Sequence, residues 1–250
     1  AQEATHGTSL RSADTDGDGL TDADEVRVWR SSPLDRDSDD DGLQDGTEVG
    51  VTSPLPDTGA GFIPDAAPGT KTNPNDDDTD DDGLSDGAED ANHNGAYGGN
   101  ETNPLDVDSD DDGLQDGTER GATTGVSGTD TNVFVPDADP GTTTNPRDDD
   151  SDNDGLLDGT EDLNHDGRWD GNQPGTASDE TDPNDTNSDD EAGDDQAEGG
   201  TGPTAPDGDS DGRIDAIDFC VGNDATGDAD HDGVCGDRDL CSGSNDAIDT

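Results

Sequence analysis

Apolar side chains are spread thinly along this chain, and most stand alone between polar neighbours. The segments before the acidic motifs contain proline and show no apolar repeat of 3.6 residues, so they predict no long amphipathic helix. One short helix is predicted over residues 22–30, where Asp22 is an N-capping acid and Val26 and Trp29 form an apolar pair. No apolar run approaches the roughly 18 residues of a membrane-spanning helix.

The polar positions follow a twelve-residue pattern, D-x-D/N-x-D-G-L-x-D-x-x-E. Five complete copies occupy residues 14–25, 37–48, 78–89, 108–119 and 150–161. Two related copies at 90–101 and 162–173 carry Asn at some of these positions, and the second ends in Gln. The letters of 37–48 return unchanged at 108–119, so a larger unit has been duplicated and the chain is a tandem repeat.

This spacing is typical of a calcium-binding loop. Calcium takes six to eight oxygen ligands, and a twelve-residue loop supplies them from positions 1, 3, 5, 7, 9 and 12, with position 7 contributing its backbone carbonyl. Position 6 is glycine in every complete copy, where the chain must turn sharply with positive φ. The preceding prolines exclude the first helix of an ordinary EF-hand.

The complete copies predict these ligands: Asp14, Asp16, Asp18, Leu20, Asp22 and Glu25; Asp37, Asp39, Asp41, Leu43, Asp45 and Glu48; Asp78, Asp80, Asp82, Leu84, Asp86 and Glu89; Asp108, Asp110, Asp112, Leu114, Asp116 and Glu119; Asp150, Asp152, Asp154, Leu156, Asp158 and Glu161. The two related copies add Asp90, Asn92, Asn94, Glu101, Asp162, Asn164, Asp166 and Asp170. Ca2+ is therefore the predicted cofactor.

Composition explains why metal is needed. The chain has 69 acidic and 10 basic residues, a net charge of −59, and only 22% apolar residues. Burial of this small apolar surface cannot offset the conformational entropy that is lost when the chain is ordered. Bound calcium, instead of a hydrophobic core, is therefore expected to make the fold. The charge also disfavours nucleic acid and anionic membrane surfaces as partners. The predicted fold is mostly irregular, with EF-hand-like DxDxDG loops, short helical turns and few short strands.

The segments before the loops complete a longer motif. Ser32-Pro33-Leu34-Asp35 precedes the loop at 37, and Asn103-Pro104-Leu105-Asp106 precedes the loop at 108. Together with their loops, these segments resemble the thrombospondin type 3 repeat, in particular its bacterial form, over most of residues 14–173. The resemblance implies an irregular chain wrapped around a file of calcium ions, usually in large secreted or surface-anchored proteins. It also implies that adjacent loops share carboxylates, and that the acids two residues before position 1 reach a neighbouring or second ion: Asp35, Asp76, Asp106 and Asp148.

Two long inserts, residues 49–74 and 120–146, depart from the compact spacing of that family. Phe62 and Phe134, each followed by an apolar residue and proline, are expected to pack locally or to pair as short edge strands. The predicted organisation is an N-terminal segment (1–13), two calcium-binding repeats (14–50), a long-insert unit (51–125), its second copy (126–178), a degenerate acidic linker (179–206) and cysteine-containing repeats (207–250).

The cysteine-containing repeats hold two further loops, which end in Asp. Their predicted ligands are Asp207, Asp209, Asp211, Asp215, Asp218, Asp228, Asp230, Asp232 and Asp239. They resemble the cysteine-containing variant of the same family. One repeat holds Cys220 and Cys235, which leaves Cys241 to pair beyond residue 250 or with another molecule; a Cys235–Cys241 pair is a third possibility.

Other chemistry is not favoured. His93, His165 and His231 fall at position 4 of a loop, which points away from the ion, so they are expected to be exposed fillers and not zinc ligands. The G-x-S-x-G match at 208–212 lacks the flanking strand and helix of a nucleophile elbow. With no low-dielectric pocket predicted to tune a general acid, the chain is not expected to be an enzyme.

The sequence therefore predicts a secreted or cell-surface structural protein, such as a stalk, an adhesin segment or a filament subunit, stiffened by calcium. Its expected partners are calcium ions, and copies of itself or other surface molecules. Two alternatives are a calcium-binding spacer of a larger secreted enzyme and a calcium-sequestering matrix protein. The regular loops favour the first two roles over the third. The absence of a catalytic segment from these 250 residues favours the structural role over the spacer.

Overall fold

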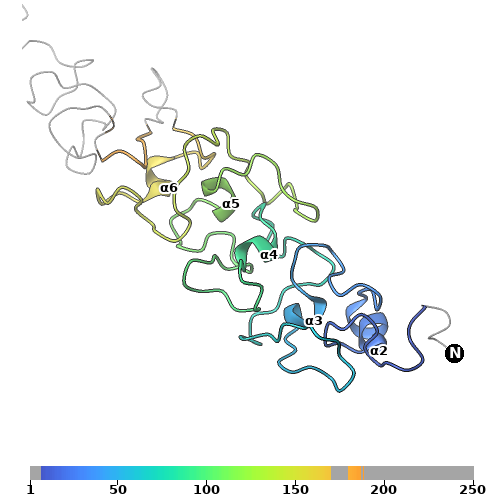
Figure 1. The fold of residues 1–250 in the computed structure, drawn as a ribbon. Helices are drawn as coiled ribbons and strands as arrows, with labels where there is room; N and C mark the ends of the chain where they lie inside the picture. The colour runs from blue at the N-terminus through green and yellow to red at the C-terminus, as the bar shows by residue number, and fades with distance from the viewer. Residues whose placement is uncertain (1–6, 170–179, 187, 189–250) are drawn as a thin grey trace, which may run out of the picture. The chain divides into compact units, whose positions relative to one another are not determined.

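The computed structural model describes residues 7–169, 180–186 and 188, which form short helical turns joined by long irregular segments (Figure 1). The predicted irregular fold with short helical turns is therefore confirmed. The expected short strands are not found among these described residues. The chain divides after Asp149, so residues 7–149 (the first part) and the described residues from 150 onward (the second part) are treated separately.

Each helix is a short turn at the end of an acidic loop. In the first part these are α2 (Asp22–Asp24), continued by the π-helical turn η1 (Glu25–Trp29), then α3 (Asp45–Glu48), α4 (Asp86–Glu89) and α5 (Asp116–Glu119). The second part contains α6 (Asp158–Glu161). The helical turns thus begin at loop position 9, and position 12 lies one turn later. Every helix in the described part of the chain is too short and too polar to span a bilayer.

The helix predicted over 22–30 is observed as α2 followed by η1, but its cap differs from the prediction. Thr21 is the N-cap, and its side chain accepts a hydrogen bond from the Asp24 backbone N–H. Asp22 cannot serve as the cap because Thr15 engages its carboxylate, through the backbone N–H at 2.8 Å and the hydroxyl at 2.9 Å.

Each loop is closed by hydrogen bonds between residues close in sequence. In the loop that begins at Asp37, the Gly42 N–H donates to Asp37 Oδ2 at 3.0 Å and the Leu43 N–H donates to Asp41 Oδ1 at 2.7 Å. The φ of Gly42 is 107°, which explains why position 6 is glycine. The bond from position 6 to position 1 recurs in the loops that begin at Asp14, Asp78, Asp108 and Asp150. Because these bonds are local, the twelve-residue spacing alone specifies the loop.

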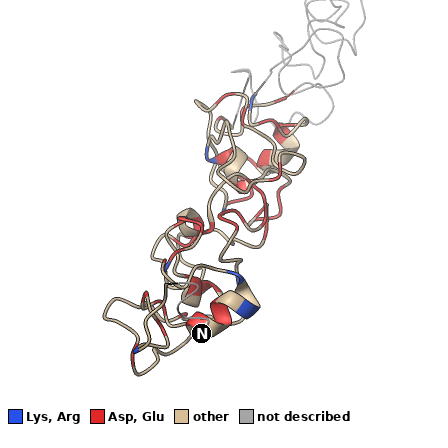
Figure 2. Ribbon diagram, turned by 90° about the vertical axis from the view of Figure 1, so that its right-hand side faces the viewer, with Lys and Arg blue, Asp and Glu red and all other residues tan. Residues whose placement is uncertain are grey.

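Carboxylates occupy much of the interior that apolar side chains fill in other proteins. The buried apolar residues among those described are Leu20, Leu43, Val49, Leu114 and Phe134. The largest fully buried side chains of the first part include Glu25, Glu48, Glu89 and Glu119. Figure 2 shows acidic residues recurring at the short helices and along the segments between them, with few basic residues nearby. A buried ion must be paired or hydrogen-bonded, so these carboxylates require a partner.

Successive loops of the first part are joined by glycine at position 10. The backbone N–H of Gly46 donates to Asp18 Oδ2 of the preceding loop at 3.0 Å, and the Gly87 N–H donates to Asp41 Oδ2 at 2.9 Å. The same bond joins Gly117 to Asp82. A Cβ atom at any of these glycines would overlap the backbone carbonyl oxygen of the acid from the preceding loop. Only glycine therefore allows the helical turn to sit this close.

The side chains of Phe62 and Phe134 project from the two long inserts and lie against acidic loops. Phe62 contacts Gly19, and Phe134 contacts Gly83. Neither residue lies in a strand. They pack against acidic loops far back along the chain, so both expected arrangements, local packing and pairing as short edge strands, are wrong.

Candidate metal sites

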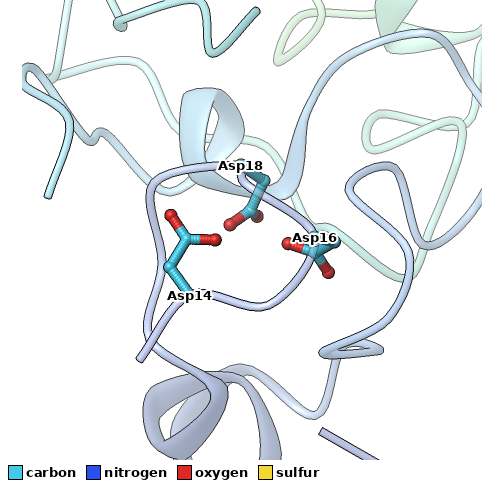
Figure 3. A group of neighbouring side chains, drawn as sticks. All are labelled: Asp14, Asp16 and Asp18. Atoms are coloured by element: carbon cyan, nitrogen blue, oxygen red, sulfur yellow. The ribbon is translucent and has the colours of Figure 1, made fainter. Parts of the chain in front are cut away.

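The first kind of site is a cage formed inside one loop. Asp14, Asp16 and Asp18, at positions 1, 3 and 5, have carboxylate oxygens within 4.8 Å of one another. Figure 3 shows these three carboxylates directed toward the space that their loop encloses. The same cage is formed by Asp37, Asp39 and Asp41 and by Asp78, Asp80 and Asp82. The predicted ligands at positions 1, 3 and 5 are thus brought together.

The second kind of site lies at the junction between two loops. Asp18 and Glu25, at positions 5 and 12 of one loop, meet Asp45, at position 9 of the next, with oxygens within 4.8 Å. The corresponding junction of the loops at 78 and 108 brings together Asp82, Glu89 and Asp116. All of these side chains are buried. The sequence assigned position 9 to its own loop, whereas in the structure its carboxylate lies with positions 5 and 12 of an earlier loop.

Position 9 is oriented by its own loop before it reaches the neighbouring one. Both carboxylate oxygens of Asp45 accept hydrogen bonds from Ser38, from the backbone N–H and from the hydroxyl, each at 2.7 Å. Thr79 holds Asp86 in the same way, at 2.8 and 2.6 Å. Each carboxylate oxygen has a further lone pair, so Asp45 is fixed in place and can still bind a cation with Asp18 and Glu25.

Glu25 and Glu89 are buried without a partner. Neither has any exposed surface, and neither of their two carboxylate oxygens has a hydrogen-bond donor. Burial, followed by the nearby Asp16 and Asp18, raises the pKa of Glu25 to about 9. Burial, followed by Asp82 and other nearby acids, raises the pKa of Glu89 to about 10. At neutral pH each carboxylate must therefore hold either a proton or a cation.

The cage aspartates also have raised pKa values. Burial is the largest cause, and it raises the pKa of Asp16 to about 6 and that of Asp18 to about 7. Burial likewise raises the pKa of Asp80 to about 7 and that of Asp82 to about 8. Neighbouring carboxylates add to these shifts, because like charges held close together disfavour ionisation. A divalent cation placed among them would reverse the effect.

Three of the acids that lie two residues before a loop contact an earlier loop through their backbone. The Asp76 N–H donates to Asp39 Oδ2 at 2.9 Å. The backbone of Asp106 bonds to Asp80 in the same manner, and that of Asp148 to Asp110. The side chains of Asp35, Asp106 and Asp148 are exposed. Asp76, Asp106 and Asp148 thus help to hold a position-3 acid, whereas the Asp35 N–H donates to the Ser32 carbonyl, and the Asp76 side chain is half-buried.

The loop at 90–101 also brings its predicted ligands together. Asp90 accepts hydrogen bonds from the backbone N–H groups of Asn94, at 3.2 Å, and Gly95, at 2.6 Å. The side-chain amide of Asn92 donates to Glu101. Position 12 therefore closes onto position 3 in this loop.

The second part contains a ligand candidate that the spacing did not predict. In the loop that begins at Asp162, the Asn164 amide donates to Oε1 of Glu180 at 2.9 Å, as Asn92 does to Glu101. Glu180 has no exposed surface. A signal was present in the sequence, because Glu101-Thr-Asn-Pro returns as Glu180-Thr-Asp-Pro. The longer interval before Glu180 hid it from a fixed twelve-residue pattern.

The remaining predicted residues fall into two groups. Asp170, the three cysteines, His231 and the ligands from Asp207 to Asp239 lie outside the described residues. His93 and His165 are half-buried, so the expectation that they are exposed is wrong. The His93 ring lies against Gly42, and its Nε2 is 3.1 Å from the Gly87 carbonyl oxygen. The His93 side chain, at position 4, points out of its own loop, but it points toward neighbouring loops, which cover it.

Comparisons with protein-family models, curated proteins and solved structures find no match for this chain. The resemblance of its motifs to thrombospondin type 3 repeats therefore stays a prediction. Its function is inferred from the loops and their junctions.

Proposed function

We propose that this chain is a structural protein of the cell exterior, in which a series of calcium ions takes the place of a hydrophobic core. The observation that carries the proposal is the Glu25 carboxylate. It is fully buried, has no hydrogen-bond donor and lies among Asp18 and Asp45 from two different loops. Three ionised carboxylates this close together require a cation between them, and without one they must take up protons.

The donor set favours calcium among the possible cations. The groups described above contain Asp and Glu only, with no His or Cys. Carboxylate oxygens suit hard cations such as calcium and magnesium, whereas zinc prefers nitrogen and sulfur. Calcium accepts six to eight ligands in irregular geometry, which fits crowded carboxylates better than the strict octahedron of magnesium.

The sharing of ligands supports a continuous series of ions. Asp18 belongs both to the cage with Asp14 and Asp16 and to the junction with Glu25 and Asp45. Asp82 has the same double role at the loops of 78 and 108. Since one carboxylate can bridge two ions, binding in a loop would promote binding at its junction. Folding and metal binding would then be one process.

A structural role is favoured over simple calcium sequestration. The glycine bonds between loops, such as that from Gly46 to Asp18, serve no purpose in a disordered calcium reservoir. The exterior location is part of the proposal, and it goes with an affinity in the range of extracellular calcium modules, with dissociation constants of about 0.1 to 1 mM. A stalk, an adhesin segment and a filament subunit all use such an element.

The test is a calcium titration of the full chain, followed by hydrodynamic radius and circular dichroism. We expect the radius to fall sharply with a midpoint near 0.1 to 1 mM calcium, since ions bound to extracellular modules have that affinity. Magnesium at equal concentration should produce a much smaller change. A radius that stays constant through millimolar calcium would overturn the proposal.

A further inference from the structure

The two long inserts fold back over particular loops. The insert 49–74 places the Phe62 ring against Gly19 of the loop at 14, where a Cβ atom would lie 2.7 Å from Phe62 Cε2. The insert 120–146 places Phe134 over Gly83 of the loop at 78, again so closely that a Cβ atom would overlap the ring. In both cases the insert covers the complete twelve-residue copy before the one from which it emerges, and in the second case the related loop at 90–101 lies between these two copies in sequence.

A threonine hydroxyl of each insert also reaches the first ligand of the covered loop. Thr58 Oγ1 donates to Asp14 Oδ2 at 2.5 Å. Thr129 Oγ1 donates to Asp78 Oδ2. Each insert therefore contacts the cage at two points, the glycine at position 6 and the acid at position 1.

Each insert is anchored to the loop from which it emerges. Gln44 donates from its side-chain amide to the Gly61 carbonyl at 2.9 Å and accepts from the Ile63 N–H at 3.0 Å. Thr47 donates to the Ile63 carbonyl at 2.6 Å. The second insert repeats this arrangement with Gln115 and Thr118, which bond to Val133 and Val135. The position of the phenylalanine is thus set by paired hydrogen bonds.

Coverage divides the cages into two groups. Asp14 is 2% exposed and Asp78 is fully buried, whereas Asp37 and Asp108, at the same position of the other loops, are half-buried. Gly19 and Gly83 are buried under the phenylalanines. The corresponding Gly42 and Gly113 are exposed, although the His93 ring touches Gly42.

We propose that the inserts create two kinds of cation site: occluded cages in the loops at 14 and 78, and an open cage in the loop at 37, with the loop at 108 uncovered in the same way. An ion leaves an occluded cage only after the insert lifts from its loop, a local opening that exposes the phenylalanine. Asp78 Oδ1 is buried and unpartnered, as are Asp37 Oδ1 and both carboxylate oxygens of Asp110 in the open loops, so the two kinds of site differ in the cover over positions 1 and 6. The inference rests on the proposed function, since it assigns release rates to its calcium ions.

The test measures calcium release from the calcium-loaded full chain, mixed in a stopped-flow instrument with an excess of a fluorescent chelator. Two phases are expected, and the slow one should be roughly tenfold slower or more, since the phenylalanine must lose its contact with the loop before release. Phe62→Ala should move one ion from the slow phase to the fast phase. Phe134→Ala should do the same for a second ion, and the double variant should release both of these ions fast.

Variants of the two threonine hydroxyls, and control variants at exposed residues, distinguish the covering of a cage by its insert from a general loss of folding. Thr58→Val and Thr129→Val keep the size of the side chain, and each should speed the same slow ion as the phenylalanine variant of its insert. Ile63→Ala and Val133→Ala change exposed side chains beside the phenylalanines and should leave both phases unchanged. If these control variants accelerated the slow phase of calcium release equally, the covering role of the inserts would be overturned.

The outcomes distinguish this inference from the proposed function. A single release phase from a chain that does bind calcium and becomes compact would refute the two kinds of site and leave the structural role intact. A chain that binds no calcium would refute both. Two phases that persist unchanged in the Phe62→Ala, Phe134→Ala double variant would also refute the assignment.

Discussion

At the scale of one residue, Glu25 carries the proposal that the chain depends on metal. Its carboxylate is buried among Asp18 and Asp45 and no donor compensates it. We predict that Glu25→Gln removes a charged ligand and weakens calcium binding at that junction by roughly tenfold or more. Isothermal titration in millimolar calcium should show one weakened site.

The same substitution should have the opposite effect without metal. In excess chelator at pH 7, Glu25→Gln removes a carboxylate that is costly to bury uncompensated, so the metal-free variant should be no less compact than the wild type. Asp40→Asn is the charge-matched control, because Asp40 is exposed at position 4 and Asn153 occupies that position in another loop with φ of 65°. If Asp40→Asn lowers calcium affinity as much as Glu25→Gln, the junction site is refuted.

Individual ligands were predictable to different degrees. Positions 1, 3 and 5 follow from spacing because Asp14, Asp16 and Asp18 lie within one short loop, which local hydrogen bonds to Asp14 and Asp18 close. The role of Asp45 was not predictable in this way. Its partners Asp18 and Glu25 belong to another loop, and nothing in the spacing specifies how two loops approach each other.

At the scale of the element, the close approach of successive loops rests on one glycine. We predict that Gly87→Ala separates α4 from the loop at 37, because the added Cβ would overlap the Asp41 carbonyl oxygen. The Gly87–Asp41 hydrogen bond of 2.9 Å would be lost with it. The expected destabilisation is about 1 to 3 kcal/mol in saturating calcium, as for other overpacked sites, measured by denaturant unfolding.

Gly69→Ala is the matched control for this variant, since a Cβ atom at Gly69 meets nothing within 4 Å. Hydrogen exchange should show the loss of protection near the loops at 37 and 78, with the loop at 108 much less affected. Repeat proteins respond in this local way because each unit contacts mainly its neighbours. A uniform loss of protection along the first part would contradict independent junctions.

The elements themselves were only partly predictable. The helical turn after Thr21 was expected from its capping acids and apolar pair, whereas α3 to α6 arise inside the loops, where no apolar period marks them. The inserts were recognised as departures from regular spacing, but their return to earlier loops was not. Phe62 and Gly19 are far apart in sequence, and a single chain carries no local signal of such a contact.

At the scale of the whole molecule, charge is the dominant problem. A net charge of −59 opposes any compact form, so the chain needs many cations or protons. Neutralisation by divalent ions alone would take roughly thirty, more than the loops that the sequence displays. Junction ions that share carboxylates with the cages, as at Asp18, reduce this difference.

Protons and calcium would compete for the same carboxylates. The compact form should therefore respond to pH in opposite directions without and with calcium. The pKa of Glu25 rises from 4.5 to about 9 in the compact form, so that form binds more protons than the unfolded chain between these values. The stability of the metal-free compact form should therefore fall as pH rises through this range, and its radius should increase. In calcium the direction of the pH effect reverses, because calcium must displace those protons. The calcium concentration at the midpoint of the titration should therefore rise as pH falls from 8 to 6.

Both halves of this prediction are measured on the same chain. Light scattering across pH in excess chelator gives the first trend, and calcium titrations at several pH values give the second. Calcium added at pH 7 to a weakly buffered solution should also release protons, because binding requires ionised carboxylates. If acid expanded the metal-free chain, or if calcium bound without proton release, the buried carboxylates would not be the groups that hold the ions.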